Sequence, residues 1–271
     1  ARELRDFCDR HDITYNLIGK VVVATNEEEL PALETLFERG TANGVEGIQM
    51  IDAQRLNEIE PHAFGVRALH CPNTGIIDYK EVSRAYATEM QENGGDLFMN
   101  TKVLSIQSSD AAINIQTTQG DFEGKHLINC AGLYADSVVR MMGLKSNVRI
   151  IPFRGEYYTI APEKHHLVNG LIYPVPNPLF PFLGVHYTRL IHGGVEAGPN
   201  AVLAFAREGY SKGIINIPEF MGTLAYRGFW SMSRKYWKTG MGEIYRSFSK
   251  KAFTRALQKL LPAIQEEDLV P

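Results

Sequence analysis

The sequence of 271 residues has no run of about 18 apolar residues, so it contains no segment typical of a membrane-spanning helix. It has no stripe of basic residues either, because its 28 lysines and arginines are scattered and its net charge is −3. Nucleic-acid-binding surfaces need such a concentration of positive charge. We therefore expect no nucleic-acid partner.

Cysteine is scarce and odd in number. Cys8, Cys71 and Cys130 lack the spacing of metal ligands, so we expect neither a disulfide framework nor a bound metal. Reduced thiols are typical of a reducing compartment, and the apolar core of a signal peptide is absent. These features predict a cytoplasmic protein.

The remaining composition is that of a folded globular protein. Hydrophobic residues make up 44% of the sequence and charged residues 22%, which argues against disorder and against a fibrous repeat. A chain of this length can bury a core in one large domain or in two interleaved domains.

The pattern of apolar residues predicts a mixture of helices and strands. Helices are expected where apolar residues recur every three or four positions, and strands where β-branched residues are frequent. The predicted helices lie at 4–8, 30–37, 53–60, 79–93 and 135–142, and again from 218 onward. The predicted strands lie at 13–15, 20–24, 48–51, 97–99, 103–106, 113–117, 122–128, 150–152, 157–160, 183–187 and 190–197.

The stretch 127–136 predicts a strand, a tight turn and a helix in immediate succession. An apolar strand leads into Ala131-Gly132, and apolar residues then recur at helical spacing until Gly143. A small residue at the turn lets the backbone approach a ligand, and a helix N-terminus favours phosphate groups. By itself, however, such a unit is more often an ordinary turn of an α/β protein.

Five short sequence motifs resemble motifs of a known protein family. They are INCAGLYAD at 128–136, PFRGEYY at 152–158, LIYPVP at 171–176, FLGVH at 182–186 and GPNA at 198–201. The first resembles a flavin-contacting motif of the FAD-dependent D-amino-acid-oxidase-like oxidoreductases. The other four resemble the branch of that family that acts on L-2-hydroxyglutarate. The resemblance extends over essentially the whole chain and implies oxidation of a 2-hydroxy acid with FAD as cofactor.

The resemblance also implies which residues hold FAD. The backbone of Ala131, Gly132 and Leu133 corresponds to the flavin-contacting turn, and Val103 corresponds to the residue whose backbone holds the adenine. A core valine is the alternative for Val103. Relatives begin with a strand and a G-x-G-x-x-G turn for the ADP half, and this pattern is absent from the sequence. We therefore expect this chain to lack the N-terminal mononucleotide-binding unit and a C-terminal flavin-contacting tail.

Two residues are candidates for the chemistry. Arg154 can clamp a carboxylate with its planar guanidinium, and an ion pair with Glu156 is the alternative. His186 is the candidate base because an imidazole titrates near neutral pH. A buried core histidine is the alternative there, and the base could instead belong to an N-terminal part of the relatives. The candidate hydrogen-bonding partners of a dicarboxylate substrate are Tyr157, Tyr173 and Asn200.

The predicted fold is α+β or α/β with two interleaved domains. Residues 1–77 and 149–271 are expected to form a mixed-sheet substrate domain with helices, and residues 78–148 a partial, Rossmann-like FAD-binding domain.

The predicted reaction converts L-2-hydroxyglutarate to 2-oxoglutarate and passes electrons to oxygen or a quinone. The alternatives are a catalytically silent fragment, and a related flavin enzyme that oxidises an amine or glycerol 3-phosphate.

A quinone-linked enzyme would also contact the inner face of a membrane. We expect such peripheral contact at the helical end that carries Trp230, Trp237 and Lys250-Lys251. Ordinary packing explains these residues equally well.

Overall fold

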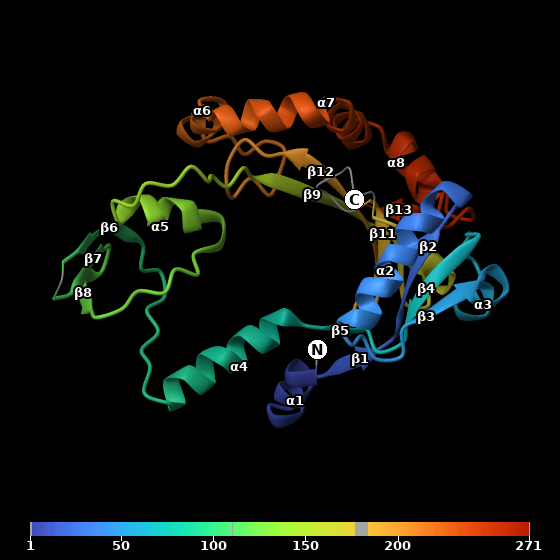
Figure 1. Ribbon diagram of the computed structural model, residues 1–271, viewed down its shortest axis with the longest axis horizontal. Coiled ribbons are helices and arrows are strands. Elements are labelled where there is room, and N and C mark those ends of the chain that lie inside the picture. The colour runs from blue at the N-terminus through green and yellow to red at the C-terminus, as the bar shows by residue number, and fades with distance from the viewer. Residues whose placement is uncertain (1, 110, 177–183, 271) are drawn as a thin grey trace. The chain divides into compact units, whose positions relative to one another are not determined.

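The computed structural model describes residues 2–109, 111–176 and 184–270 (Figure 1). The chain forms two compact units, each built from separate stretches of sequence. Unit 1 comprises residues 1–85, 155–202 and 232–271, and unit 2 comprises residues 86–154 and 203–231. The predicted class, a mixed α/β fold with interleaved domains, is confirmed. The assignment of 1–77 and 149–271 to the substrate, and of 78–148 to FAD, stays a prediction.

Unit 1 is built on an eight-stranded mixed sheet. Its strands β2 (Lys20–Ala24) and β10 (Leu171–Pro174) are parallel, and their outer neighbours β4 and β11 join them antiparallel. The order across the sheet is β13 (Leu269–Val270), β9 (Phe153–Ile160), β12 (Val195–Leu203), β11 (His186–Arg189), β10, β2, β4 (Arg67–Cys71) and β3 (Gln49–Asp52).

The sequence patterns predicted most of these strands at the observed positions, but they predicted β9 incorrectly. The expected hairpin of 183–187 and 190–197 is confirmed by the antiparallel pair β11 and β12. Residue 183, where this hairpin was expected to begin, lies outside the described residues, and so do the first two residues of the motif at 182–186. Two strands flanking a bend at Arg154 were expected, but β9 runs without interruption from Phe153 to Ile160. Its β-branched and aromatic residues favour one continuous extended segment.

One face of the sheet carries the main hydrophobic core. Ile172 and Tyr187 are fully buried there and pack with Phe253 and Leu257 of α8 (Lys250–Leu257). Removing each large apolar side chain from water stabilises the fold by about 1.5–3 kcal/mol. The Tyr187 hydroxyl is satisfied inside this core because it donates to the Leu257 carbonyl at 3.1 Å.

The opposite face carries a smaller core under helix α2 (Leu30–Ala42) (Figure 1). Leu33 of that helix is fully buried among Val22 and Leu69 of the sheet. The other elements of unit 1 are α1 (Arg2–Arg10), β1 (Tyr15–Leu17), η1 (Glu27–Glu29), α3 (Ala53–Ile59), β5 (Gly75–Ile77), η3 (Pro162–Leu167) and η4 (Glu266–Asp268).

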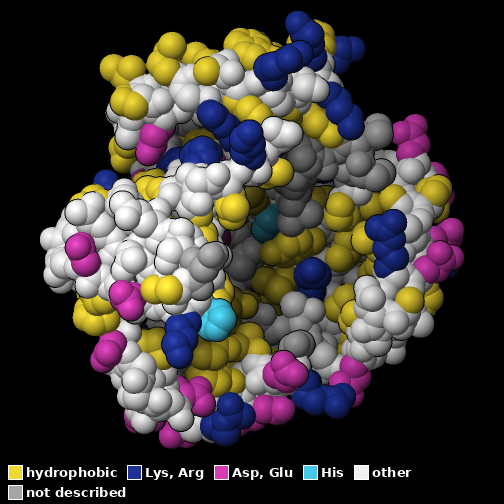
Figure 2. Space-filling view, turned by 60° about the vertical axis from the view of Figure 1, so that its left-hand side comes forward, with side chains coloured by type: hydrophobic (Ala, Val, Ile, Leu, Met, Phe, Trp, Pro, Cys, Tyr) yellow, Lys and Arg dark blue, Asp and Glu magenta, His cyan; other side chains and the backbone are white. Residues whose placement is uncertain are grey.

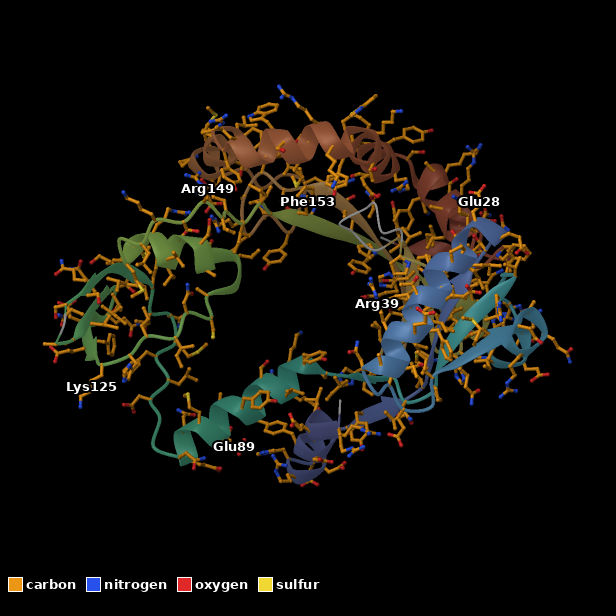
Figure 3. All side chains as sticks on the ribbon, in the orientation of Figure 1. Glu28, Arg39, Glu89, Lys125, Arg149 and Phe153 are labelled. Atoms are coloured by element: carbon orange, nitrogen blue, oxygen red, sulfur yellow. The ribbon has the colours of Figure 1, made fainter. Side chains whose placement is uncertain are left out.

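Unit 2 contains a small antiparallel sheet and short helices. Its strands are β6 (Val103–Ser108), β7 (Ile113–Thr117) and β8 (Gly120–Gly124), and Lys125 follows β8 with an exposed side chain (Figure 3). Among the described residues, unit 2 contributes only four buried hydrophobic residues, Ile106, Ala204, Ala206 and Phe229. Its helices are η2 (Gly132–Tyr134), α5 (Ala135–Met141) and α6 (Ile217–Leu224).

Two helices continue from one unit into the other along the sequence. They are α4 (Tyr79–Glu92) and α7 (Arg227–Phe248), and α7 has a non-helical residue, Tyr236. The Asp78 carboxylate accepts a hydrogen bond from the Lys80 N–H at 2.7 Å, so the expected start of α4 is confirmed. In the described part of the chain, no helix has the length and apolar character that crossing a membrane requires.

The strands predicted at 97–99 and 150–152 do not form, and the strand predicted at 122–128 forms only as far as Gly124. Residues 97–99 and 125–131 are irregular, and β8 ends at Gly124 although a strand was expected through Ile128. Ile128 is 85% exposed, and Leu97, Phe98 and Met99 are exposed as well. An extended apolar segment forms a strand only where another strand pairs with it, and the described residues supply no partner for either segment.

Candidate functional site

A cluster of polar side chains lies on one face of the unit 1 sheet. Ile172 of β10 pairs with Tyr187 of β11, so the next pair along the two strands is Tyr173 opposite His186. Because side chains alternate between the faces of a sheet, these two point away from the main core that holds Ile172 and Tyr187. The same alternation places Lys20 of β2 on their side.

The three side chains are in contact. The rings of Tyr173 and His186 are stacked, with centroids 3.9 Å apart and planes inclined by 18°. Lys20 Nζ lies 4.8 Å from the centroid of the Tyr173 ring. The structure therefore brings two predicted site residues together and adds a cation that sequence reasoning missed. Lys20 opens a predicted strand, but nothing local in the sequence indicates which strands will flank it.

His186 is held in the tautomer that a base requires. Its side chain is buried, and Nδ1 lies 3.0 Å from the Gly184 carbonyl oxygen, which can only accept a hydrogen bond. Nδ1 therefore carries the proton and Nε2 carries the lone pair. Burial lowers the pKa of His186, and the Lys20 charge lowers this pKa further, while the hydrogen bond to Gly184 acts in the opposite direction. The imidazole is thus neutral near neutral pH.

Tyr157 of β9 covers a glycine of the neighbouring strand. Gly198 of β12, which pairs with His186, has φ = +152°, and a Cβ there would lie 2.7 Å from Cδ1 of Tyr157. Only glycine accommodates this approach and this backbone conformation. Burial, together with Tyr173 and Glu196, raises the pKa of Tyr157, so its hydroxyl keeps its proton and can donate.

Asn200, the third candidate for substrate binding, has contacts with α7. Its side chain is completely buried, its Nδ2 donates to the Glu243 carbonyl oxygen at 2.8 Å, and its Oδ1 accepts from Arg246 Nε at 3.2 Å. These bonds attach α7 to β12. A substrate contact of Asn200 stays a prediction.

Arg154 belongs to unit 2. Its Nη1 donates to the carbonyl oxygens of Gly209 and Ser211, both at 3.2 Å. The side chain is half-buried at the start of β9. Its role as a carboxylate clamp stays a prediction.

The turn at 131–133 in unit 2 is held by the side chain of Asn129, which bonds to the backbone before and after it. Asn129 accepts from the Ala131 N–H at 3.2 Å and donates to the Ala135 carbonyl at 2.9 Å. Gly132 has φ = +50°, and a Cβ placed on it would meet no atom within 4 Å. Its backbone is therefore open to a ligand, and this turn fits the close approach of a flavin.

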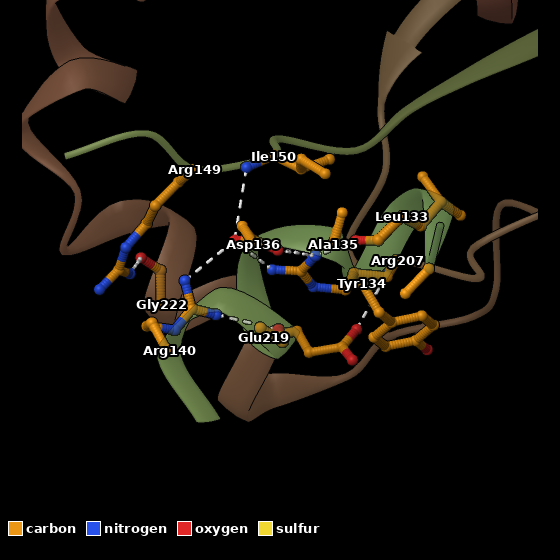
Figure 4. Close-up of polar contacts among 12 residues, drawn as sticks. Leu133, Tyr134, Ala135, Asp136, Arg140, Arg149, Ile150, Arg207, Glu219 and Gly222 are labelled. Atoms are coloured by element: carbon orange, nitrogen blue, oxygen red, sulfur yellow. Dashed lines mark hydrogen bonds and ion pairs between the residues drawn. The ribbon is translucent and has the colours of Figure 1, made fainter. Parts of the chain in front are cut away.

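Behind this turn lies a network of charged groups that sequence reasoning missed (Figure 4). Arg207 binds both carboxylate oxygens of Asp136, at 2.6 and 2.9 Å, and also donates to the Leu133 carbonyl. Arg140 adds a bond to Asp136 at 3.0 Å. Burial alone would raise the pKa of Asp136, but the bonds from Arg207 and Arg140 outweigh it and lower this pKa to about 2.

A cavity of about 260 Å³ adjoins this network in unit 2, with Tyr134, Arg149, Arg207 and Phe220 in its wall. Arg149 donates to the Gly222 carbonyl at 3.1 Å. The two guanidinium groups are thus engaged with the protein itself. Val103 lies elsewhere in unit 2, half-buried and paired with Thr117, and its adenine contact stays a prediction.

Curated proteins similar to this chain include several called L-2-hydroxyglutarate dehydrogenase. The one from Indibacter alkaliphilus is 54% identical over 99% of this chain and 67% of its own length. The one from Escherichia coli strain K12 is 40% identical over 100% of this chain and 64% of its own length. The mitochondrial one from Nematostella vectensis is 41% identical over 97% and 61%. The chain thus spans about two thirds of the length of these relatives.

Solved structures share the fold at low sequence identity. L-α-glycerophosphate oxidase from Mycoplasma pneumoniae with FAD bound has a TM-score of 0.73 at 21% identity, over 96% of this chain and 60% of its own. L-proline dehydrogenase from P. horikoshii has a TM-score of 0.70 at 17% identity, over 99% and 62%. The sequence model of the family described as FAD dependent oxidoreductase matches residues 1–264. On these grounds, the chain belongs to the FAD dependent oxidoreductase family.

Proposed function

We propose that this chain takes part in the FAD-dependent oxidation of a 2-hydroxy acid, L-2-hydroxyglutarate, to 2-oxoglutarate. The observation that carries the proposal is the cluster of the buried His186 with the half-buried Tyr173 and Lys20, which offers a neutral base beside a cation. The relatives called L-2-hydroxyglutarate dehydrogenase support the choice of substrate, because they match nearly the whole chain.

Each residue of the cluster has a role in this proposal. Lys20 binds a carboxylate of the substrate through its ammonium group. Tyr157 and Tyr173 donate hydrogen bonds that orient the substrate. His186 Nε2 accepts the proton of the C2 hydroxyl as the C2–H bond breaks. FAD, when bound, supplies the acceptor of the hydride.

The remaining predicted residues keep separate roles in the proposal. Arg154 binds a carboxylate, and Asn200 contacts the substrate. The backbone of Ala131, Gly132 and Leu133 holds the flavin, and that of Val103 holds the adenine. The final electron acceptor is oxygen or a quinone, and the place of action is the cytoplasm, with peripheral contact at the inner face of the membrane.

The experiment that tests this proposal separates cofactor binding from turnover. The purified chain is mixed with FAD, freed of unbound cofactor, and titrated anaerobically with L-2-hydroxyglutarate while its visible absorbance is recorded. We expect retained flavin absorbance and bleaching by the substrate. Glycerol 3-phosphate and glycine, tested in parallel, should leave the absorbance unchanged. Bleaching by either of them instead would assign the alternative substrate classes.

Failure has two separable forms. A chain that retains no FAD would support the alternative of a catalytically silent fragment. A chain that retains FAD but is not bleached by L-2-hydroxyglutarate would contradict the proposed substrate.

A variant of the base provides a second test. His186→Asn should lower the rate of flavin reduction by about 10²–10⁴-fold, the usual contribution of a general base. The matched control is His166→Asn, because His166 is an exposed histidine outside the cluster. Equal rates for His186→Asn and the unmodified chain would remove His186 from the mechanism.

A further inference from the structure

Glu60 is an acidic residue in the interior of unit 1. It directly follows α3, and its exposed fraction is only 2%. Figure 2 shows where carboxylates normally lie, because acidic side chains occur at many places on the surface of the molecule. Taking a carboxylate out of water costs free energy, so a buried one needs hydrogen bonds from its surroundings. The partners of Glu60 therefore show what its burial achieves.

Both carboxylate oxygens of Glu60 hold the segment that leads into β10. Oε2 accepts from the Asn169 N–H at 2.9 Å, and Oε1 accepts from the Gly170 N–H at 2.6 Å. The Asn169 side chain also donates to the Ile59 carbonyl at 2.9 Å. Leu171, the first residue of β10, follows directly. The end of α3 is thus fastened to the start of β10.

Arg189, the last residue of β11, binds the same segment. Its Nη1 donates to the carbonyl oxygen of Val168 at 2.6 Å and to that of His165 at 3.4 Å. Burial raises the pKa of Glu60, while the two N–H bonds and the Arg189 charge offset part of this rise. The segment 165–170 is therefore held by a carboxylate and by a guanidinium. We call Glu60 and Arg189 the anchoring pair.

The anchoring pair acts where β10 begins and β11 ends. Because Leu171 pairs with Thr188, the preceding pair along these antiparallel strands is Gly170 opposite Arg189. Three pairs further along the same strands are the stacked rings of the candidate site. The anchoring pair thus fixes the register in which these two rings meet.

The third strand of the candidate site, β2, meets the same junction. It begins at Lys20, which pairs with Leu171. A Cβ on Gly170 would lie 2.8 Å from the Ile18 carbonyl oxygen and 3.1 Å from that of Gly19, so glycine is needed for this close approach. One junction therefore holds the starts of β2 and β10 together with the end of β11.

We propose that Glu60, together with Arg189, is a positioning residue for the reaction, because it fixes the register of the three strands that carry the base His186 and its neighbours. A slip of β10 by one residue would turn Tyr173 toward the main core. It would also move the Asn169 and Gly170 N–H groups away from Glu60 and leave a buried carboxylate without partners, which is costly. This inference rests on the proposed function.

Nuclear magnetic resonance of the full chain tests the positioning without FAD or substrate. In the unmodified chain, stacking on Tyr173 shifts the ring-proton signals of His186, and burial and Lys20 lower its pKa. In Glu60→Gln, one N–H of the segment faces an amide NH₂ group instead of an oxygen. We expect the ring shift to decrease and the pKa of His186 to rise toward its usual value of about 6.5.

The same variant should slow the reduction of bound flavin by L-2-hydroxyglutarate. A misplacement of about 1 Å at the reacting groups costs about 10²-fold in rate, so we expect a loss of about 10–10²-fold at saturating substrate. If the substrate does not bleach the unmodified chain, the proposed function fails. The resonance signals still decide in that case whether Glu60 positions His186.

Asp268→Asn is the matched control for a general loss of stability. Asp268 is another buried carboxylate of unit 1, 5% exposed, and it accepts from the Gln265 N–H at 2.8 Å. It lies next to β13, which β9 and β12 separate from β11 in the sheet. Urea unfolding should show that both variants are destabilised, while Asp268→Asn keeps the His186 signals and the rate of the unmodified chain.

Arg189→Lys is a milder second variant, because lysine keeps the charge but lacks the planar guanidinium. It should move the His186 signals in the same direction as Glu60→Gln but less, and it decides the question if Glu60→Gln does not fold. Unchanged His186 signals in a folded variant of the anchoring pair would overturn the proposal. So would an equal change in Asp268→Asn, because loss of stability alone would then explain the effect.

Discussion

In unit 1, an eight-stranded sheet buries apolar residues on both faces, whereas unit 2 buries few apolar residues and holds its turn and helix α5 in place with the Asp136–Arg207 ion pair. The polar cluster of unit 1 is positioned by strand register on a rigid sheet. The turn at 131–133 of unit 2 is positioned by hydrogen bonds from charged side chains. The cluster on the sheet is therefore stabilised by the whole core of unit 1. The turn held by charged groups depends instead on pH and on a few contacts.

The largest expected effect is a loss of core packing. Leu257→Ala removes a fully buried side chain from the main core of unit 1 and should lower the free energy of unfolding by about 4 kcal/mol. Ile106→Ala in the sparse interior of unit 2 should cost about 2 kcal/mol, because its surroundings can collapse more easily. Urea denaturation monitored by circular dichroism measures both. Equal costs would contradict the difference between the two units.

A somewhat smaller effect is expected for the ion pair of unit 2. Asp136→Asn leaves Arg207 with an uncompensated charge and should destabilise unit 2 by about 3 kcal/mol. Hydrogen exchange should accelerate at 131–141 and leave the strands of unit 1 unaffected. Asp121→Asn, which changes an exposed carboxylate of unit 2, is the control. Faster exchange in both units would show that the ion pair supports more than its own unit.

Acid should reveal the same ion pair without a mutation. Because the pKa of Asp136 is about 2 in the folded protein and about 4 in an unfolded chain, its contribution to stability is present above about pH 4. That contribution, about 2 kcal/mol, should be lost as the pH falls from about 4 to about 2. The measurement is urea unfolding across this pH range. Asp136→Asn should remove this part of the pH dependence.

The smallest expected effect concerns the electrostatics of the unit 1 cluster. Lys20→Met removes one of the causes that lower the pKa of His186, so this pKa should rise while burial continues to lower it. A base acts in its neutral form, and the acidic limb of the pH profile of flavin reduction should therefore move to higher pH. Nuclear magnetic resonance titration of His186 measures the same shift directly. An unchanged pKa would show that Lys20 does not act on His186.

Local sequence patterns located a large part of the fold. The helix after Asp78, the hairpin of β11 and β12 and the helices after 218 follow from capping residues and periodicity, which act over a few positions. The same reasoning was wrong at 97–99 and near Ile128. Their apolar residues favour strands, but a strand needs a partner, and a pattern within one segment contains no information about its partners.

For the candidate site too, the sequence indicated residue types, while strand pairing decided which residues are in contact. The residue types of His186, Tyr173 and Tyr157 indicated polar chemistry, and the resemblance raised them as candidates. Their contact with Lys20 follows from the parallel pairing of β2 and β10, which joins segments about 150 residues apart in the sequence. Asn200 was a candidate for the same site, but tertiary structure places it elsewhere. Its described side-chain contacts are with α7 and not with the other candidates.

The sequence by itself determined the mixed α/β class and the local elements, because composition, capping and periodicity depend on neighbouring residues. Its resemblance to known proteins indicated the family. Only the tertiary structure decided which side chains meet, since register and packing depend on segments far apart in the chain. Asp136 and Arg207 are 71 positions apart and bind each other in unit 2. The polar bonds between α7 and β12 likewise join segments about 40 residues apart, and they decide which face of the helix remains in solvent.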